Sequence, residues 1–398
     1  MTWKKNFVVI MLCLIIFGLN GATYRNTHAN GGLDANQPPS VNFTYMPTNP
    51  TDIDLVQFQD NSFDPDGWIV AWMWYFGDGN SSLLQNPNHK YSDNGIYQIS
   101  LTVIDNNGII NTTTKIVSIL NVPPVANCGD DRYVNRHVLN LNASESYDSD
   151  GDIINYTWVI NETQCYYGKN INYTFGSDGT YNVSLTVTDN DGENDSDRCI
   201  LTVDTQPPVT SLTITGEKGA NNWYIENVTV VLDTKDETSG IKHIKYRFDN
   251  SIWYRYNKPF NVSLQGKHTL SYYTMDNAHN IEEEKVVSLN IDTTDPYVKI
   301  IQPKENFLYL LSRINWPIPE NTVIIGPLLI KIEARDKEAG IERVEFYVDN
   351  TLRCLTKEPP YYWVWDEMSL GRCKLMTILY DKSGRQSSDE IDIIGFIL

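Results

Sequence analysis

Acidic side chains in short, glycine-containing loops are the residues of this sequence that could do chemistry. Three loops, "DPDG", "DSDGD" and "DNDGENDSD", contain the candidate ligands Asp64, Asp66, Asp148, Asp150, Asp189 and Asp191. Their carboxylate oxygens are the ligands that a hard cation such as calcium prefers, although none of the loops has EF-hand spacing. Aspartate and glycine also form turns without any ion. Both a calcium site and a purely structural turn therefore stay open.

The sequence has no recognisable catalytic constellation. Its histidines are scattered, and no two of them have metal-ligand spacing. There is no nucleophile-elbow serine, no phosphate-binding glycine loop and no Cys-x-x-Cys motif. Two loop carboxylates could still act as a glycosidase pair if folding brought them together in a cleft. Because the carboxylates recur at turn positions, we expect a protein that is not an enzyme, with no cofactor unless it is calcium.

The first 29 residues are typical of an export signal and leader. Lys4 and Lys5 precede an apolar segment at 7–19, and Ala22 and Ala29 are candidate cleavage sites. The apolar segment is short for a spanning helix, although an uncleaved anchor stays open, and we expect no further transmembrane segment. The net charge of -19 argues against nucleic acid as a partner. We expect an extracellular or cell-surface protein.

Potential glycosylation sites agree with export. Asn-x-Ser/Thr sequons would lie on exposed loops or strand faces if the host glycosylates them, although an Asn- and Thr-rich β-protein also forms sequons by chance. They begin at Asn42, Asn80, Asn111, Asn142, Asn155, Asn161, Asn172, Asn182, Asn194, Asn227 and Asn261.

The sequence contains an internal repeat, which appears when it is aligned with itself at a shift of 84 residues. The segment "DPDGWIVAWMWYF" from Asp64 aligns with "DSDGDIINYTWVI" from Asp148, and Trp74 meets Trp158. The same shift carries "YSDNGIYQISLTVIDNNG" onto "FGSDGTYNVSLTVTDNDG" without a gap. Unbroken register over this length indicates two copies of one domain.

A second repeat, at a shift of 100, relates "DETSGIKHIKYRFDN" to "DKEAGIERVEFYVDN". Proline pairs or Asp-Pro open each unit and stop strands from continuing between units. Within the units the apolar residues alternate with period two, which predicts strands. We therefore predict an all-β fold, a tandem array of four immunoglobulin-like β-sandwiches after the signal peptide. Their ranges are 36–121, 122–205, 206–293 and 294–398.

The stretch "WMWYFGDG" is predicted to be a central strand that meets its turn. Trp72 and Trp74 share one face, and a sandwich core needs one large aromatic side chain from such a strand. Gly77 and Gly79 suit positive φ angles, and Asp78 can accept a hydrogen bond from the backbone two residues on. Asp78 is therefore expected to hold a corner.

The "DPDG" loop, "WYFGDG" and "HKYSDNGIYQISLTVIDNNG" resemble the polycystic kidney disease (PKD) domain family of immunoglobulin-like sandwiches. The second unit resembles it through "DSDGDI", "YTW" and "GTYNVSLTVTDNDG", but lacks the Phe-Gly-Asp-Gly turn. The last two units resemble bacterial-type immunoglobulin-like repeats through "SGIKHIKYRFDN", "AGIERVEFYVDN" and "LYDKSGR". These resemblances imply extracellular spacing, adhesion or accessory binding, usually without catalysis.

Strand direction suggests how the cysteines pair. Strands that begin at Cys128 and Cys199 start at the same end of a sandwich, whereas Cys165 follows a central strand toward the opposite end. We therefore predict a Cys128–Cys199 disulfide, a free Cys165 and a second disulfide, Cys354–Cys373, between the only cysteines of the fourth unit.

The sequence thus predicts an exported rod that acts in adhesion, spacing or interaction with an extracellular protein or polysaccharide. The alternative is a carbohydrate-binding accessory protein for an extracellular enzyme. Aromatic runs at 251–260 and 361–366 could stack on sugar rings, but strand alternation buries about half of each run and favours a core role.

Overall fold

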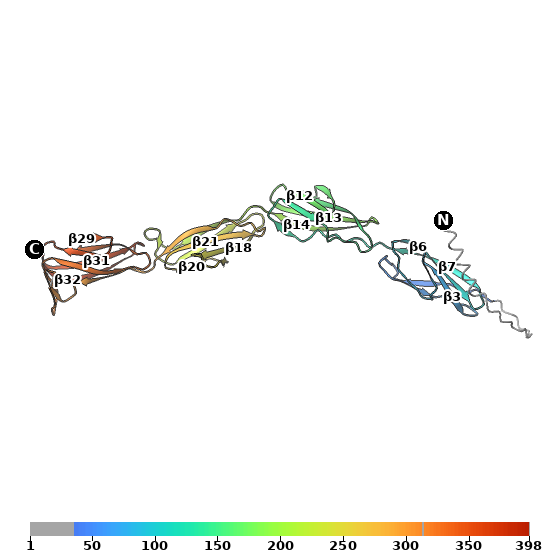
Figure 1. The fold of residues 1–398 in the computed structure, drawn as a ribbon, viewed down its shortest axis with the longest axis horizontal. Coiled ribbons are helices and arrows are strands. Elements are labelled where there is room, and N and C mark those ends of the chain that lie inside the picture. Colours follow the sequence, from blue (N-terminus) through green and yellow to red (C-terminus); the bar gives the residue numbers. More distant parts are fainter. Residues whose placement is uncertain (1–35, 313, 398) are drawn as a thin grey trace, which may run out of the picture. The chain divides into compact units, whose positions relative to one another are not determined.

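The computed structural model describes residues 36–312 and 314–397, and every regular element in these ranges is a β-strand (Figure 1). The chain divides into two compact units, 1–122 and 123–398. The predicted all-β class is therefore confirmed. The expected export signal and leader lie outside the described residues. Within the described residues, no helix is long and apolar enough to span a membrane.

The first compact unit is a sandwich of two sheets with the strand orders β1-β2-β5 and β4-β3-β6-β7. Its strands are β1 Phe43–Met46, β2 Val56–Asp60, β3 Ile69–Tyr75, β4 Ser81–Ser82, β5 Asn88–His89, β6 Gly95–Asp105 and β7 Ile110–Ile119. Alternate residues of β6 are buried, as the period-two pattern predicts. The core forms around Trp74, which is fully buried and lies 5.1 Å from the ring of Phe43.

The turn after β3 explains the "WYFGDG" stretch. Gly77 and Gly79 have φ angles of 87° and 96°, which side chains rarely tolerate. A Cβ on Gly77 would also lie 2.9 Å from the backbone of Gln98. The Asp78 carboxylate accepts the backbone N–H of Asn80 at 2.9 Å and contacts His89 Nε2 at 2.7 Å. Asp78 is thus the corner that the sequence predicts.

The second compact unit begins with a sandwich in which a five-stranded sheet, β11-β10-β13-β14-β8, faces the pair β12-β9. Its strands are β8 Arg132–Val134, β9 Val138–Asn142, β10 Ile153–Ile160, β11 Gln164–Tyr167, β12 Asn170–Thr174, β13 Gly179–Asp189 and β14 Asn194–Val203. Trp158 is fully buried, and its indole N–H donates to the Gly168 carbonyl at 3.0 Å. Trp74 donates to the Leu84 carbonyl at the same distance, so the repeat extends to the tryptophan hydrogen bond.

The third sandwich has the sheets β15-β17-β20 and β16-β22-β21-β18-β19. Its strands are β15 Val209–Thr215, β16 Trp223–Tyr224, β17 Val228–Lys235, β18 Ile241–Phe248, β19 Tyr254–Tyr256, β20 Phe260–Val262, β21 Gly266–Asp276 and β22 Lys285–Ile291. Val228, Leu270 and Leu289 lie at the centre of its apolar core, where none of them is exposed to solvent.

The fourth sandwich extends the same plan, with the sheets β23-β27-β30 and β25-β24-β26-β32-β31-β28-β29. Its strands are β23 Tyr297–Gln302, β24 Phe307–Leu310, β25 Ile314–Pro317, β26 Thr322–Ile325, β27 Leu328–Arg335, β28 Ile341–Val348, β29 Thr351–Thr356, β30 Tyr362–Trp365, β31 Ser369–Asp381 and β32 Gln386–Ile397. Each of the four predicted ranges therefore contains its own apolar core.

The cysteines follow the prediction in the second sandwich only. A disulfide joins Cys128 and Cys199, and Cys165 is free and exposed. Cys354 and Cys373 are both free, so the predicted second disulfide is wrong. The reason is that β28 lies between their strands: Phe346 pairs with Cys354 on one side and with Thr377, four residues beyond Cys373, on the other. Two strand spacings and four residues of rise separate their Cα atoms by roughly 16 Å, too far for a bridge.

Candidate metal centres

Each sandwich contains one long strand that ends on a buried aspartate. These residues are Asp105 of β6, Asp189 of β13, Asp276 of β21 and Asp381 of β31, and their exposed fractions are 1%, 0%, 0% and 2%. In every case Oδ1 accepts a hydrogen bond from the backbone N–H four residues on, at 2.8 to 3.0 Å. The four aspartates thus close equivalent turns, and the second carboxylate oxygen of each remains for other partners.

In the first sandwich the predicted ligand Asp64 lies next to Asp105. Burial, followed by the negative charges of Asp66 and Asp105, raises the pKa of Asp64. Both carboxylate oxygens of Asp64 are buried, and a hydrogen bond from the Asp66 backbone only partly offsets the rise in pKa. Asn36 also reaches this end of the sandwich, where its amide donates to Asp105 Oδ2 at 2.8 Å.

The second sandwich repeats this arrangement with Asp148 and Asp189. Burial, the side chain of Asp150 and the charge of Asp189 raise the pKa of Asp148, and a hydrogen bond from the Asp150 backbone partly offsets the rise. Both carboxylate oxygens of Asp148 are buried. The two loops are joined because Asn190 Oδ1 accepts the backbone N–H of Asp152 at 2.9 Å. The prediction that the Asp148 and Asp189 loops share one end of the sandwich is therefore confirmed.

The remaining predicted ligands lie at the margins of these pairs. Asp66 is exposed, and its Oδ2 accepts the backbone N–H of Gln37 at 3.0 Å. Asp191 is exposed and accepts the side-chain amide of Asn190 at 2.8 Å. Two groups of three carboxylates offer oxygens within 4.8 Å of one another in the described part of the chain, and they lie at the junctions before the third and the fourth sandwich. Calcium binding by the six predicted aspartates stays a prediction.

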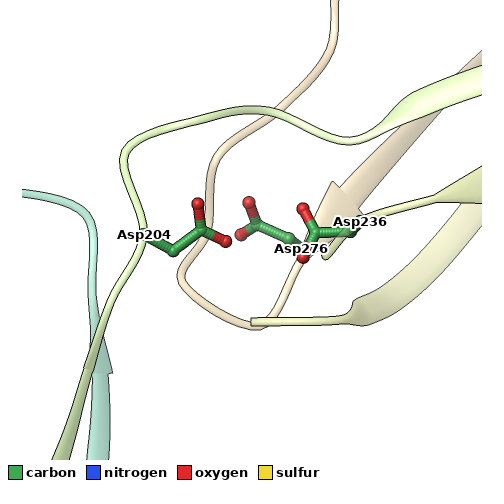
Figure 2. Close-up of side chains that lie close together, drawn as sticks. All are labelled: Asp204, Asp236 and Asp276. Carbon is green, nitrogen blue, oxygen red and sulfur yellow. The ribbon is translucent and has the colours of Figure 1, made fainter. Parts of the chain in front are cut away.

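The first group of three carboxylates consists of Asp204, Asp236 and Asp276 (Figure 2). Asp204 directly follows β14 of the second sandwich, Asp236 follows β17, and Asp276 ends β21. Burial raises the pKa of Asp276, the hydrogen bonds from Asn280 lower it, and the charges of Asp204 and Asp236 raise it again. The net effect is a raised pKa. Asn280 donates its amide to Asp276 Oδ2 at 2.8 Å, which partly compensates for the close carboxylates.

The second group consists of Asp292, Asp336 and Glu338. Asp292 directly follows β22 of the third sandwich, and Asp336 directly follows β27 of the fourth. Asp292 is fully buried, and its Oδ2 accepts the backbone N–H of Ala339 at 3.2 Å. Each group therefore combines one residue from the junction between sandwiches with carboxylates from the sandwich that follows.

None of the residues in these two groups is among the sequence-predicted ligands, although the sequence contains part of the signal. Asp236 and Asp336 are the first aligned residues of the second repeat, but we used them only to establish that repeat. Asp204 and Asp292 both stand in an Asp-Thr pair just before a proline linker. A search for acidic residues that recur at equivalent positions of different units would have selected Asp236 with Asp336 and Asp204 with Asp292, but not Glu338, whose counterpart is Thr238.

The predicted glycosylation sites lie on the surface, and the two aromatic runs differ in how deeply they are buried. All eleven sequon asparagines are exposed, and their glycosylation stays a prediction. Trp363 and Trp365 of the run at 361–366 are buried in the core and stack at 5.7 Å. In the run at 251–260, Tyr254 is 46% exposed, so this run is only partly a core element.

Comparison with known families identifies the first half of the chain. Residues 36–119 and 121–203 each match the family model of the PKD domain. The first two sandwiches are PKD domains. Residues 314–375, in the fourth sandwich, match the model of a bacterial Ig domain. The resemblances drawn from the sequence are confirmed for these segments.

Several known proteins are similar to part of this chain. The pre-pro-metalloprotease PrtV of Vibrio cholerae serotype O1 (strain M66-2) is 31% identical over 137 residues, which are 34% of this chain and 15% of that protein. Collagenase ColA of Clostridium perfringens (strain 13 / Type A) is 47% identical over 64 residues, 16% of this chain and 6% of the collagenase. The crystal structure of the PKD1 domain of Vibrio anguillarum Epp is 35% identical, with a TM-score of 0.20, and covers 21% of this chain and 96% of that domain. The chain thus matches only a small part of the two longer relatives.

Proposed function

We propose that this chain is an exported, non-catalytic protein of the cell surface or extracellular space, whose tandem sandwiches act in adhesion or spacing. The observation that carries this proposal is the pair of PKD domains followed by further sandwiches of immunoglobulin-like type. Segments similar to part of this chain belong to a pre-pro-metalloprotease and to a collagenase. An accessory role beside another activity agrees with their small share of those proteins.

The positions of the carboxylates support the absence of catalysis. A general acid and its partner act in a cleft where substrate can reach both. Here the buried aspartates Asp105, Asp189, Asp276 and Asp381 use one oxygen to hold a backbone turn. Such residues are committed to structure, and their burial restricts access by a polymeric substrate.

Two measurements on the exported chain test this proposal. Antibody detection in fractions of the producing culture should place the chain in the medium or on the cell surface. The purified chain should bind an extracellular protein or polysaccharide in a solid-phase panel and leave each component chemically intact. Retention in the cytoplasm, or turnover of a panel component that Asp105→Asn abolishes without unfolding the chain, would overturn it.

A second candidate function is carbohydrate binding, because the third sandwich has an aromatic pocket of about 550 Å³. Tyr246 stacks on Phe260 at 4.4 Å, and the exposed Tyr254 lies 5.7 Å from Tyr246. Asp249 and His268 add polar groups to the lining. Flat aromatic faces beside hydrogen-bonding side chains suit a sugar ring.

Affinity electrophoresis in gels that contain soluble polysaccharides tests this candidate. Tyr254→Ala removes an exposed ring of the pocket, whereas Tyr362→Ala removes a comparably exposed tyrosine, 49% against 46%, from the fourth sandwich. Retardation that only Tyr254→Ala abolishes would support the pocket. Equal migration of the unmodified chain in gels with and without polysaccharide would exclude it for the polymers tested.

A further inference from the structure

The cluster of acidic side chains at the start of the fourth sandwich contains a fourth carboxylate beside the three described above. Asp292, Asp336 and Glu338 place carboxylate oxygens within 4.8 Å of one another, and Asp381 at the end of β31 is a fourth carboxylate beside them. Burial raises the pKa of Asp336, the hydrogen bond from the Gly340 backbone lowers it, and the charges of Asp292 and Asp381 raise it further. Four acidic side chains thus meet where the solvent screens them poorly.

Asp381 also has a buried oxygen without a partner. The residue is 2% exposed, and its Oδ1 accepts Ser383 Oγ at 2.6 Å and the backbone N–H of Arg385 at 3.0 Å. Its Oδ2 is buried and accepts no hydrogen bond. Leaving a buried charged acceptor unsatisfied is costly, and such an atom in a folded protein requires an explanation.

The basic residues close to this group do not neutralise it. The Arg385 guanidinium turns away and donates to Asp295 Oδ1 at 2.8 Å and to the Ile225 carbonyl at 3.1 Å. Lys337 Nζ comes within 3.7 Å of Glu338 Oε1, but the lysine side chain is 92% exposed. A solvated lysine at this distance is a weak partner, so most of the negative charge stays uncompensated.

The third sandwich provides an internal comparison. Asp276 occupies the position of Asp381, and four residues later Asn280 occupies the position of Arg385. The Asn280 amide donates to Asp276 Oδ2 at 2.8 Å and to the Asp204 carbonyl at 2.8 Å. The amide therefore supplies at the third sandwich the donor that the fourth sandwich lacks.

We propose that Asp292, Asp336, Glu338 and Asp381 bind a calcium ion. Calcium takes six to eight oxygen ligands at about 2.3–2.6 Å, so two of its ligands lie no more than about 5 Å apart. The oxygens of Asp292, Asp336 and Glu338 meet this limit. Magnesium demands shorter bonds and nearly ideal octahedral geometry, which four carboxylates on separate loops suit less well.

The proposed ion would join two sandwiches. Asp292 directly follows β22 of the third sandwich, whereas the other three ligands belong to the fourth. Binding to the folded state alone stabilises that state by mass action. Calcium would therefore hold Asp292, at the end of the third sandwich, against the fourth sandwich. This effect does not depend on the proposed adhesive or spacing function.

Equilibrium dialysis with calcium, followed by metal analysis, tests the site on the exported chain. Asp381→Asn and Glu338→Gln should each lose one tightly bound calcium per chain or weaken it at least tenfold. The matched control is Asp366→Asn, which changes an exposed carboxylate on the loop after β30 of the same sandwich. Equal calcium binding by all four proteins would overturn the proposal, as would an equal loss in the control.

Thermal unfolding separates this site from a merely structural role of Asp381. In chelator, Asp381→Asn should melt no lower than the unmodified chain, because the amide removes one of four crowded charges. Calcium should then raise the melting temperature of the unmodified chain and of Asp366→Asn, and raise that of Asp381→Asn and Glu338→Gln much less. An equal calcium-induced rise in all four proteins would refute the site even if Asp381→Asn proved unstable, because Glu338 is only half-buried. Magnesium at the same concentration should give a smaller rise.

Discussion

Removing the disulfide of the second sandwich should destabilise that sandwich far more than the others. Cys128 and Cys199 are 71 residues apart in the sequence, so the bridge closes a large loop in the unfolded chain. The loop-entropy relation gives about 4 kcal/mol of stabilisation at 25 °C for a loop of this size. The double substitution Cys128→Ala and Cys199→Ala removes the constraint. Both side chains are buried, so the small cavities left behind add to the loss.

A loss of about 4 kcal/mol in a domain of this size lowers its melting temperature by roughly 15–30 °C. Because a chain with several cores does not unfold in one step, the assay must report each sandwich separately. Hydrogen exchange with mass spectrometry does so for peptides from 122–205. The matched control is Cys165→Ala, which removes an exposed, free thiol from the same sandwich. The reasoning is refuted if these peptides exchange no faster in the double variant than in the control.

Alkylation of the native chain should label the exposed Cys165 first and Cys373 last, because burial raises the pKa of the Cys373 thiol and restricts access to it; peptide mass spectrometry that finds Cys373 labelled first would contradict this order. Trp74→Ala should cost the first sandwich about 3–5 kcal/mol, because the indole is fully buried, and Trp68→Ala, at an exposed position, should cost little in the same melting experiment. The hydrogen bond with Asp249 raises the pKa of His268, so the stability from this pair is complete below about pH 6.5 and is lost as the pH rises through the raised value. Since the pair is partly exposed, the change should stay below about 1 kcal/mol, and His268→Gln should remove this pH dependence from the melting curve.

Much of the fold could be predicted because the repeats are regular. The shift of 84 that aligns Trp74 with Trp158 also relates the carbonyls to which they donate, at Leu84 and Gly168. Strand alternation and the glycine turn after β3 depend only on neighbouring residues, so the sequence contains them directly. Local pattern was therefore enough for the sandwich class and for the corner at Asp78.

The features that could not be predicted from the sequence depend on the order of the strands in space. The Cys354–Cys373 prediction counted the cysteines of a unit, but β28 separates their strands. The junction aspartates Asp204 and Asp292 each stand apart from the acidic loops in the sequence. They meet other carboxylates only because β17, β21 and their counterparts β27 and β31 end at the same side of a sandwich. Spacing along the chain shows which aspartates recur, but not which of their side chains meet in space.

The equivalent ends of the sandwiches differ in the residue that precedes each sandwich, and we expect this difference to set the order of their affinities for calcium. At the first end the preceding residue is Asn36, an amide that donates to Asp105, whereas at the fourth it is the carboxylate Asp292. Calcium affinity rises with the number of charged ligands in a site of similar rigidity. The fourth end, with four carboxylates, should therefore bind calcium more tightly than the first, where Asp64 and Asp105 lie together.

Calcium titration of single variants measures this order. Asp381→Asn should remove the tightest binding phase and leave any weaker phase unchanged, whereas Asp105→Asn should leave the tightest phase intact. If Asp105→Asn removed the tightest phase instead, the number of carboxylates would not control affinity at these ends. The buried oxygens of Asp64 would then be the stronger determinant, and a neutral amide beside them would have to serve as a ligand through its oxygen.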